Sequence, residues 1–395
     1  MKLAARTSRI GESATLRVSR RAGELARQGV EIVDFGAGEP DFASPPVAVE
    51  AARRALAEGF TRYTPALGIP RLREALAARY ARDHGAPWTA GDVAVTVGAK
   101  AALFELALAL FDDGDEVVLP SPSWVSFPEQ VRFAGARPVP VPTSAADGFR
   151  LHAEPLVEAI GPRTRAVLIN SPCNPTGGIV GADDLARLAA ACAERGVLLV
   201  ADETYERFCY EPEGHASVAA LARDLPETVV LVGSFSKTYA MTGWRLGYLF
   251  APPPVLRAVA DVQSHATSNP TSFAMVGALA ALEGAEPEVA AMIEEYRARR
   301  ELLIPRLNAL PGVSCRPPSG AFYAFPEVSA CFRPRLEDSM AMADYLLEKA
   351  GVAVVPGAAF GAEGHIRLSF ACSRADLARG VDRMAEALAA LTPRV

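Results

Sequence analysis

Short apolar runs alternate with helical segments between about residues 92 and 250, and this alternation constrains the fold more than any other feature of the sequence. Turn residues bound the runs, and each run is continuous, which is typical of strands buried on both faces of a parallel sheet. The sequence therefore predicts an α/β fold, with strands at Val93–Val97, Glu116–Leu119, Ala166–Asn170, Val197–Ala201, Val229–Val232 and Leu246–Phe250, and helices at Lys100–Phe111 and Asp183–Arg195.

Two of these strands carry further expectations. Pro120 is expected to end the strand at Glu116–Leu119, because proline lacks the N–H group that a central strand needs. The strand at Leu246–Phe250 follows Val229–Val232 after about a dozen residues. That length is barely enough for a crossover between parallel strands, so we expect Leu246–Phe250 to run antiparallel.

The length of 395 residues exceeds what one hydrophobic core usually covers, so we expect two domains. The larger domain is predicted to span residues 47–285. A smaller domain is predicted to combine residues 1–46 with residues 286–395. Its elements are expected at Pro287–Leu310 and Arg374–Leu391 for helices, and at Ala321–Phe325, Val352–Val355 and Ile366–Phe370 for strands.

Charge, hydropathy and cysteine spacing exclude several classes of protein. The formal net charge of −6 offers no general footprint for nucleic acid or for an anionic membrane. The longest apolar segment, Ala101–Phe111, is too short to cross a bilayer. The six cysteines show no metal-type spacing, so they are expected to be reduced thiols, with no metal site. No signal peptide is visible, and we expect a cytoplasmic enzyme.

The segment from Ser234 to Arg245 carries the clearest chemistry, because it follows a buried strand at its carboxyl end, where open α/β sheets bind ligands. The amine of Lys237 could form a Schiff base with an aldehyde, and the hydroxyls of Ser234 and Ser236 could donate to a phosphate ester. The guanidinium of Arg245 could neutralise that phosphate. The alternative is an ordinary surface lysine in a polar loop.

Other predicted strand ends favour the ligand-binding interpretation. Asn174 lies in a proline-stiffened loop after one strand, and its amide could donate to a phenolate oxygen. Asp202 follows the next strand, where it would either cap a helix or pair with a protonated ring nitrogen. Gly98, Ala99 and Lys100 open a helix whose free amides suit an anion. Several such loops at one sheet edge are difficult to explain as surface loops.

These residues lie in segments that resemble the class I aminotransferases, a family of fold-type I pyridoxal 5′-phosphate enzymes, nearest their bacterial aspartate aminotransferase branch. The resemblance implies a mostly parallel sheet of the seven-stranded type, flanked by helices. The matching segments are Ala37–Phe42, Arg62–Pro65, Val97–Lys100, Pro122–Ser126, Ser171–Gly177, Ala201–Tyr205, Ser234–Tyr248 and His365–Ser369.

The resemblance also implies roles for individual residues. Lys237 is expected to be the Schiff-base lysine, with Asp202 on the pyridine nitrogen and Tyr205 donating to the ring oxygen. Tyr63 is expected to reach the phosphate of a neighbouring subunit, which implies a homodimer with shared active sites. The complete expected cofactor set is Gly98, Ala99, Lys100, Trp124, Asn174, Asp202, Tyr205, Ser234, Ser236, Lys237, Arg245 and Tyr63. The expected substrate set is Gly38, Lys100, Trp124, Asn174 and Arg367.

Two features bear on the substrate. Lys100 could pair with a side-chain carboxylate, so the resemblance implies transfer of an amino group between a dicarboxylic amino acid, aspartate or glutamate, and a 2-oxo acid by a ping-pong mechanism. Against this, residues 11–15 read Gly-Glu-Ser-Ala-Thr where aspartate/prephenate-type enzymes usually begin with Lys-Pro. This departure leaves open elimination, replacement or carbon–carbon bond formation on the same scaffold. A binding module without activity is the second alternative.

Overall fold

The structure is a computed structural model, and it describes residues 3–11 and 14–391. Its centre is a seven-stranded sheet with the order β2-β8-β7-β6-β5-β3-β4. All neighbouring strands are parallel except for β8, which runs antiparallel to both β7 and β2. The α/β class and the reversed strand are thus confirmed. The strands are β2 (Val93–Thr96), β3 (Glu116–Ser121), β4 (Arg137–Pro142), β5 (Thr164–Asn170), β6 (Leu198–Asp202), β7 (Val229–Ser234) and β8 (Gly247–Phe250).

At one edge of the sheet, the structure corrects the sequence-based expectation. Pro120 does not end β3, which continues to Ser121. Pairing of β3 with β5 stops at Val118, so the missing N–H of Pro120, which would face the β5 side as that of Glu116 does, interrupts no pairing. Beyond Val118 the strand pairs only with β4 (Arg137–Pro142), an edge strand that the sequence analysis did not predict.

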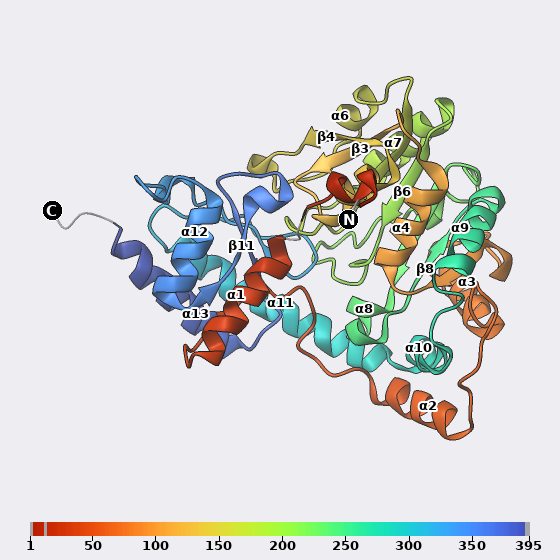
Figure 1. The fold of residues 1–395 in the computed structure, drawn as a ribbon, viewed down its shortest axis with the longest axis horizontal. Helices are drawn as coiled ribbons and strands as arrows, with labels where there is room; N and C mark the ends of the chain where they lie inside the picture. The colour runs from red at the N-terminus through yellow and green to blue at the C-terminus, as the bar shows by residue number, and fades with distance from the viewer. Residues whose placement is uncertain (1–2, 12–13, 392–395) are drawn as a thin grey trace.

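Successive residues of the central strands pack into two different cores, as alternation of side chains across a sheet requires. For example, Leu199 and Ala201 join the core beneath α3 (Pro70–His84), α7 (Ala182–Glu194) and α10 (Ser272–Gly284). Val200 joins the core on the other face, beneath α4 (Ala99–Leu110), α5 (Ser126–Ala134) and α9 (Pro253–Ala266). Helices therefore cover both faces of the sheet and leave its edge of strand ends free to bind a ligand (Figure 1).

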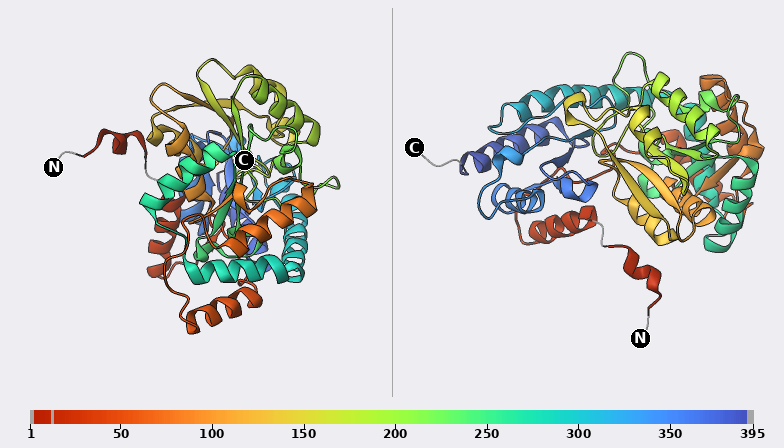
Figure 2. Two further views of the ribbon diagram at one scale, coloured as in Figure 1. Left: turned by 90° about the vertical axis from the view of Figure 1, so that its right-hand side faces the viewer. Right: turned by 90° about the horizontal axis from the view of Figure 1, so that it is seen from above.

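A separate core joins both ends of the chain (Figures 1 and 2). There β1 (Val33–Asp34) pairs in parallel with β10 (Val352–Ala353), and a second small sheet has the order β11-β12-β9. Its strands are β11 (Val355–Pro356), β12 (Ile366–Ser369) and β9 (Tyr323–Ala324). The helices around this core include α11 (Glu286–Asn308), α12 (Ser339–Tyr345) and α13 (Arg374–Ala389). The domain boundaries near residues 46 and 285 stay a prediction.

No helix in the described part of the chain is both long enough and apolar enough to span a membrane. Within residues 3–11 and 14–391 there is also no group of three or more His, Cys, Asp or Glu side chains that could hold a metal ion.

Candidate active site

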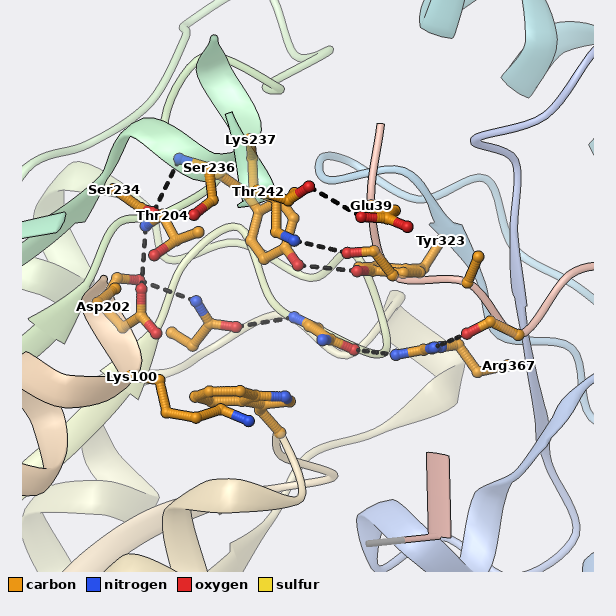
Figure 3. Close-up of a pocket in the computed structure, with 18 of the residues that line it drawn as sticks. Glu39, Lys100, Asp202, Thr204, Ser234, Ser236, Lys237, Thr242, Tyr323 and Arg367 are labelled. Carbon is orange, nitrogen blue, oxygen red and sulfur yellow. Dashed lines mark hydrogen bonds between the residues drawn. The ribbon is translucent and has the colours of Figure 1, made fainter. Parts of the chain in front are cut away.

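A cavity of about 580 Å³ lies where the strand ends of the large sheet face the segments contributed by the chain ends (Figure 3). Its size lies within the usual range for small-molecule sites. Twelve residues that the sequence analysis singled out line this cavity: Gly38, Ala99, Lys100, Trp124, Asn174, Asp202, Tyr205, Ser234, Ser236, Lys237, Arg245 and Arg367.

Lys237 lies on the one-turn helix α8 (Phe235–Thr238), directly after β7. The hydroxyl of Ser234 caps this turn by accepting from the amide of Ser236 at 3.0 Å. The Lys237 amine donates to the carbonyl oxygen of Gly38 at 2.5 Å. Burial lowers the pKa of Lys237 to about 8, although the carboxylate of Glu39 acts in the opposite direction. A lysine with such a pKa is readily deprotonated into a nucleophile.

Asp202 is the last residue of β6, and its side chain is buried. One carboxylate oxygen accepts from the amide of Thr204 at 3.0 Å. The helix-capping alternative is wrong, because the residues that follow form turns rather than a helix. Burial raises the pKa of Asp202 to about 6, since the negative charge is poorly solvated there. A cationic ligand group beside this carboxylate would stabilise its charged form.

Arg367 projects from β12 into the opposite side of the cavity and is only 2% exposed. Its guanidinium donates to the side-chain oxygen of Asn174 at 3.0 Å and to the carbonyl oxygen of Gly36 at 2.8 Å. It also lies over the ring of Tyr323, with 4.5 Å between its central carbon and the ring centroid. Each terminal nitrogen of Arg367 makes one of these two hydrogen bonds and carries a second N–H, so this cation has donor capacity left for a ligand in the cavity.

The start of α4 and the end of the 234–245 loop form an anion cradle. Arg245 has a left-handed backbone with φ 56°, and its guanidinium donates to the Thr242 carbonyl at 2.8 Å. A Cβ atom at Gly98 would lie 2.5 Å from that guanidinium. Glycine at position 98 therefore allows Arg245 to lie against the first turn of α4, where free amides also favour an anion.

Lys100 and Trp124 lie next to each other in the lining of the cavity (Lys100 is labelled in Figure 3). The ammonium of Lys100 lies 4.9 Å from the centroid of the Trp124 ring, which is within range of a cation–π interaction. Burial and the nearby charge of Arg245 lower the pKa of Lys100. A negatively charged ligand group would favour the charged ammonium and so act against both effects.

The structure does not bring every expected residue into this cavity, and it adds others. Gly98 lies just outside the lining, and the side chain of Tyr63 is 88% exposed. The acidic residue at position 12 lies outside the described residues. Tyr323 is an addition, and its hydroxyl meets that of Tyr205 at 2.8 Å. Glu39 is another, and its carboxylate accepts from the hydroxyl of Thr242 at 2.8 Å.

Comparisons with known proteins agree with this geometry. The family described as "Aminotransferase class I and II" matches residues 30–384. The chain belongs to this aminotransferase family. The "Aspartate/prephenate aminotransferase" of Thermus thermophilus is 46% identical over 98% of both chains, and the "Aspartate aminotransferase" of Geobacillus stearothermophilus is 44% identical over 97% of this chain and 98% of its own.

Solved structures of aminotransferases superimpose along nearly the whole chain. The Thermus thermophilus aspartate aminotransferase with maleate has a TM-score of 0.93 at 45% identity, covering 98% of this chain and 100% of that one. The aspartate aminotransferase from Rhizobium meliloti has a TM-score of 0.94 at 38% identity, covering 98% and 99%.

Membership of this family makes pyridoxal phosphate the cofactor of the chain. The residues of the cavity fit that group. The buried amine of Lys237 suits its aldehyde, the buried carboxylate of Asp202 suits a protonated ring nitrogen, and the cradle around Arg245 suits its phosphate. The chain is therefore a pyridoxal phosphate-dependent aminotransferase with the fold of the aspartate enzymes.

Proposed function

We propose that this aminotransferase moves the amino group of an acidic amino acid, aspartate or glutamate, to a 2-oxo acid in two successive half-reactions. The observation that carries this proposal is the presence of two cationic side chains on the lining of one cavity, the buried Arg367 and the more exposed Lys100. A dicarboxylic amino acid offers one carboxylate to each of them. Relatives named for aspartate, and a related structure that holds the dicarboxylate maleate, support the same substrate class.

The cofactor side of the proposal assigns each polar group one task. When bound, pyridoxal phosphate supplies an electron-withdrawing ring that stabilises negative charge on the substrate α-carbon. Asp202 would keep the ring nitrogen protonated, and the hydroxyl of Tyr205 and the amide of Asn174 would donate to the ring oxygen. Ser234, Ser236, Arg245 and the amides of Ala99 and Lys100 would hold the phosphate, while Trp124 would stack on the ring.

Three residues of the cavity are proposed to bind the substrate. Arg367 would bind the α-carboxylate through the remaining N–H groups of its two terminal nitrogens, with the backbone of Gly38 beside it. Lys100 would bind the side-chain carboxylate. The free amine of Lys237 lies next to Gly38, where it could accept the proton of the substrate α-carbon and donate it again. A pKa near 8 suits an amine that must both accept and donate this proton near neutral pH.

We also propose a homodimer in the cytoplasm. Tyr63 exposes 88% of its surface in the single chain, and no residue of η1 (Ala5–Arg9), which lies over α5, is buried. Leu3 and Ile10 expose apolar surface at the two ends of that segment. Sedimentation equilibrium tests this state, and Tyr63→Phe should weaken cofactor binding if its hydroxyl reaches the phosphate of the partner.

The substrate proposal is tested by mixing the purified holoenzyme with single amino acids in the absence of any acceptor. The visible absorption of the bound cofactor should be lost with aspartate or glutamate at concentrations where alanine and leucine leave it unchanged. An equal response to all four amino acids would contradict the acidic substrate class, and formation of another product without amino transfer would contradict the reaction.

A second arm isolates Lys100. Lys100→Ser should raise KM for aspartate and glutamate by about tenfold or more, because the second carboxylate loses its cationic partner, while KM for neutral amino acids changes little. The cofactor dissociation constant is measured separately, since Lys100 lies near the cradle. If kcat/KM falls equally for acidic and neutral substrates, Lys100 serves the cofactor phosphate instead.

A further inference from the structure

In the turn that carries Asp202 and Tyr205, some side chains point into the cavity and others point away from it. Asp202 and Tyr205 line the cavity. Glu203 and Glu206 are equally buried but do not line the cavity, and their carboxylates bind groups on the other side of the turn. A buried carboxylate needs a compensating partner, so each of these two glutamates requires an explanation.

Glu203 is bound from three directions by one short segment. Its carboxylate accepts from the hydroxyl of Ser217 at 2.6 Å and from the amide of Val218 at 2.8 Å. The Nε2 atom of His215 lies 3.1 Å from the same carboxylate. The side chain of His215 is 7% exposed and that of Glu203 is 2% exposed, so both groups are removed from water. Residues 215–218 thus hold Glu203 in place, and with it the turn that begins at Asp202.

Glu206 has a separate cation. Its carboxylate accepts from the guanidinium of Arg79 and from the hydroxyl of Tyr80, the latter at 3.3 Å. Arg79 also donates to the hydroxyl of Tyr248 at 3.4 Å. Because Arg79 neutralises Glu206, the charge that remains for His215 to compensate is that of Glu203. Burial alone would lower the pKa of His215, but Glu203 and, less strongly, Glu206 raise it above its ordinary value.

The charge of Glu203 affects the neighbouring carboxylate of Asp202. Burial is the largest cause of the raised pKa of Asp202, and the negative charge of Glu203 raises it further. The hydrogen bonds from Thr204 and the charge of Lys237 act in the opposite direction. An imidazolium at position 215 offsets the charge of Glu203, and this favours ionised Asp202.

We propose that His215 and Glu203 form a buried ion pair that positions Asp202 and keeps it ionised, so that His215 is a positioning residue for the cofactor site. The proposal rests on the role of Asp202 in the proposed function. It assigns no contact with substrate or cofactor to His215. Its effect passes through Glu203 and the backbone of the turn.

The first experiment tests the ion pair itself and needs neither cofactor nor substrate. The ring signals of His215 are followed by NMR in the apoprotein with ¹³C-labelled histidine, and are assigned with His215→Gln. The midpoint of titration should lie above the ordinary histidine value, and in Glu203→Gln it should fall below that value, because burial then outweighs the weaker effect of Glu206. A midpoint at or below the ordinary value in the wild type would overturn the proposal, whatever reaction the enzyme catalyses.

The second experiment separates positioning from simple stabilisation. In His215→Gln, kcat at saturating cofactor should fall about tenfold when it is measured at a pH below the pKa of Asp202, because a rise of roughly one pKa unit there lowers the ionised fraction of Asp202 about tenfold. Glu203→Gln and the double variant Glu203→Gln/His215→Gln should both stay within about threefold of the wild type, because the repelling charge is gone. His152→Gln is the matched control, since His152 pairs with Asp147 at 2.8 Å on the surface.

If the ion pair were only structural, all three variants would lower Tm and leave kcat unchanged, or the double variant would be the slowest of the three. Either result overturns the positioning role. If the wild type transfers no amino group to any acceptor, the proposed function fails, while the NMR titration still decides whether the ion pair exists.

Discussion

The two walls of the cavity are built in different ways. On one wall, Asp202, Ser234 and Lys237 lie at the ends of strands or within three residues of them, so hydrogen bonds of the seven-stranded sheet place them. On the other wall, Arg367 lies on β12 of the small three-stranded sheet, and side chains from different segments also position one another. Arg367 donates to Asn174 and to the carbonyl of Gly36, and it lies over the ring of Tyr323, whose hydroxyl meets that of Tyr205.

This difference indicates a division of labour. A wall fixed by a sheet can hold a cofactor in one geometry through the whole reaction. A wall fixed by side chains and short segments can rearrange around a substrate that enters and leaves. Changes to the sheet wall should therefore lower kcat, and changes to the other wall should mainly raise KM. The following predictions test that separation.

Lys237→Ala should have the largest effect, a loss of kcat of at least ~10²–10⁴-fold, because it removes both the nucleophile and the group that transfers the proton. Steady-state kinetics at saturating cofactor measure this loss. Lys349→Ala, at an exposed lysine, is the control and should have normal activity. Near-normal turnover by Lys237→Ala would show that Lys237 is neither the nucleophile nor the proton-transfer group.

Asp202→Ala should lower kcat by about 10²-fold, because the buried anion that holds the ring nitrogen protonated is lost. Cofactor affinity, measured by fluorescence titration of the apoprotein, should fall much less than kcat. A variant that binds cofactor poorly but turns over normally once saturated would show that Asp202 contributes to binding rather than to catalysis.

Arg367→Lys should raise KM for the amino acid by about tenfold to hundredfold, because a lysine cannot reproduce bidentate binding of a carboxylate. The fall in kcat should be smaller than the rise in KM. Arg300→Lys is a matched control, since Arg300 binds the Pro318 carbonyl away from the cavity lining. A loss confined to kcat would contradict the division between the two walls.

The smallest effect concerns the pH dependence of apoprotein stability. Burial lowers the pKa of Lys237 to about 8, below its ordinary value of 10.5, so the unfolded chain binds more protons than the folded chain between these two values. The free energy of unfolding of the wild type should therefore rise relative to that of Lys237→Ala as the pH increases from 8 to about 10. Thermal melts of both apoproteins measure this, and a constant difference in Tm would contradict the lowered pKa.

The sheet wall could be predicted from the sequence because its signals are local. A continuous apolar run such as Val229–Val232 identifies a buried strand, and the polar residues after it must lie at the sheet edge. Strand β4 gave no such signal, since prolines at 138, 140 and 142 resemble a loop. They are tolerated because β4 lies at the edge of the sheet.

The other wall could be predicted only through the family resemblance, and then incompletely. Gly38 and Arg367 belong to matching segments, whereas Tyr323 lies in a two-residue strand whose place depends on the packing of the small sheets. The link between Glu203 and His215 joins residues twelve positions apart through irregular backbone. No periodicity in the sequence records such a contact, because tertiary packing alone creates it.

The reversed direction of β8 also determines the architecture of the 234–245 loop. If β8 ran parallel to β7, the connection would have to return to the end of the sheet where β7 begins, and Arg245 would lie away from the site. Because β8 returns antiparallel, the loop starts and finishes at the same edge. This one loop therefore carries the Lys237 amine, the two serine hydroxyls and the Arg245 guanidinium to the same site. Gly247 follows this loop, and a larger residue would not fit there, because a Cβ atom would lie 2.3 Å from the amide nitrogen of Ala99. Exchange of residues 234–245 between related enzymes should therefore transfer the phosphate-binding groups together only if Gly247 is included in the exchanged segment.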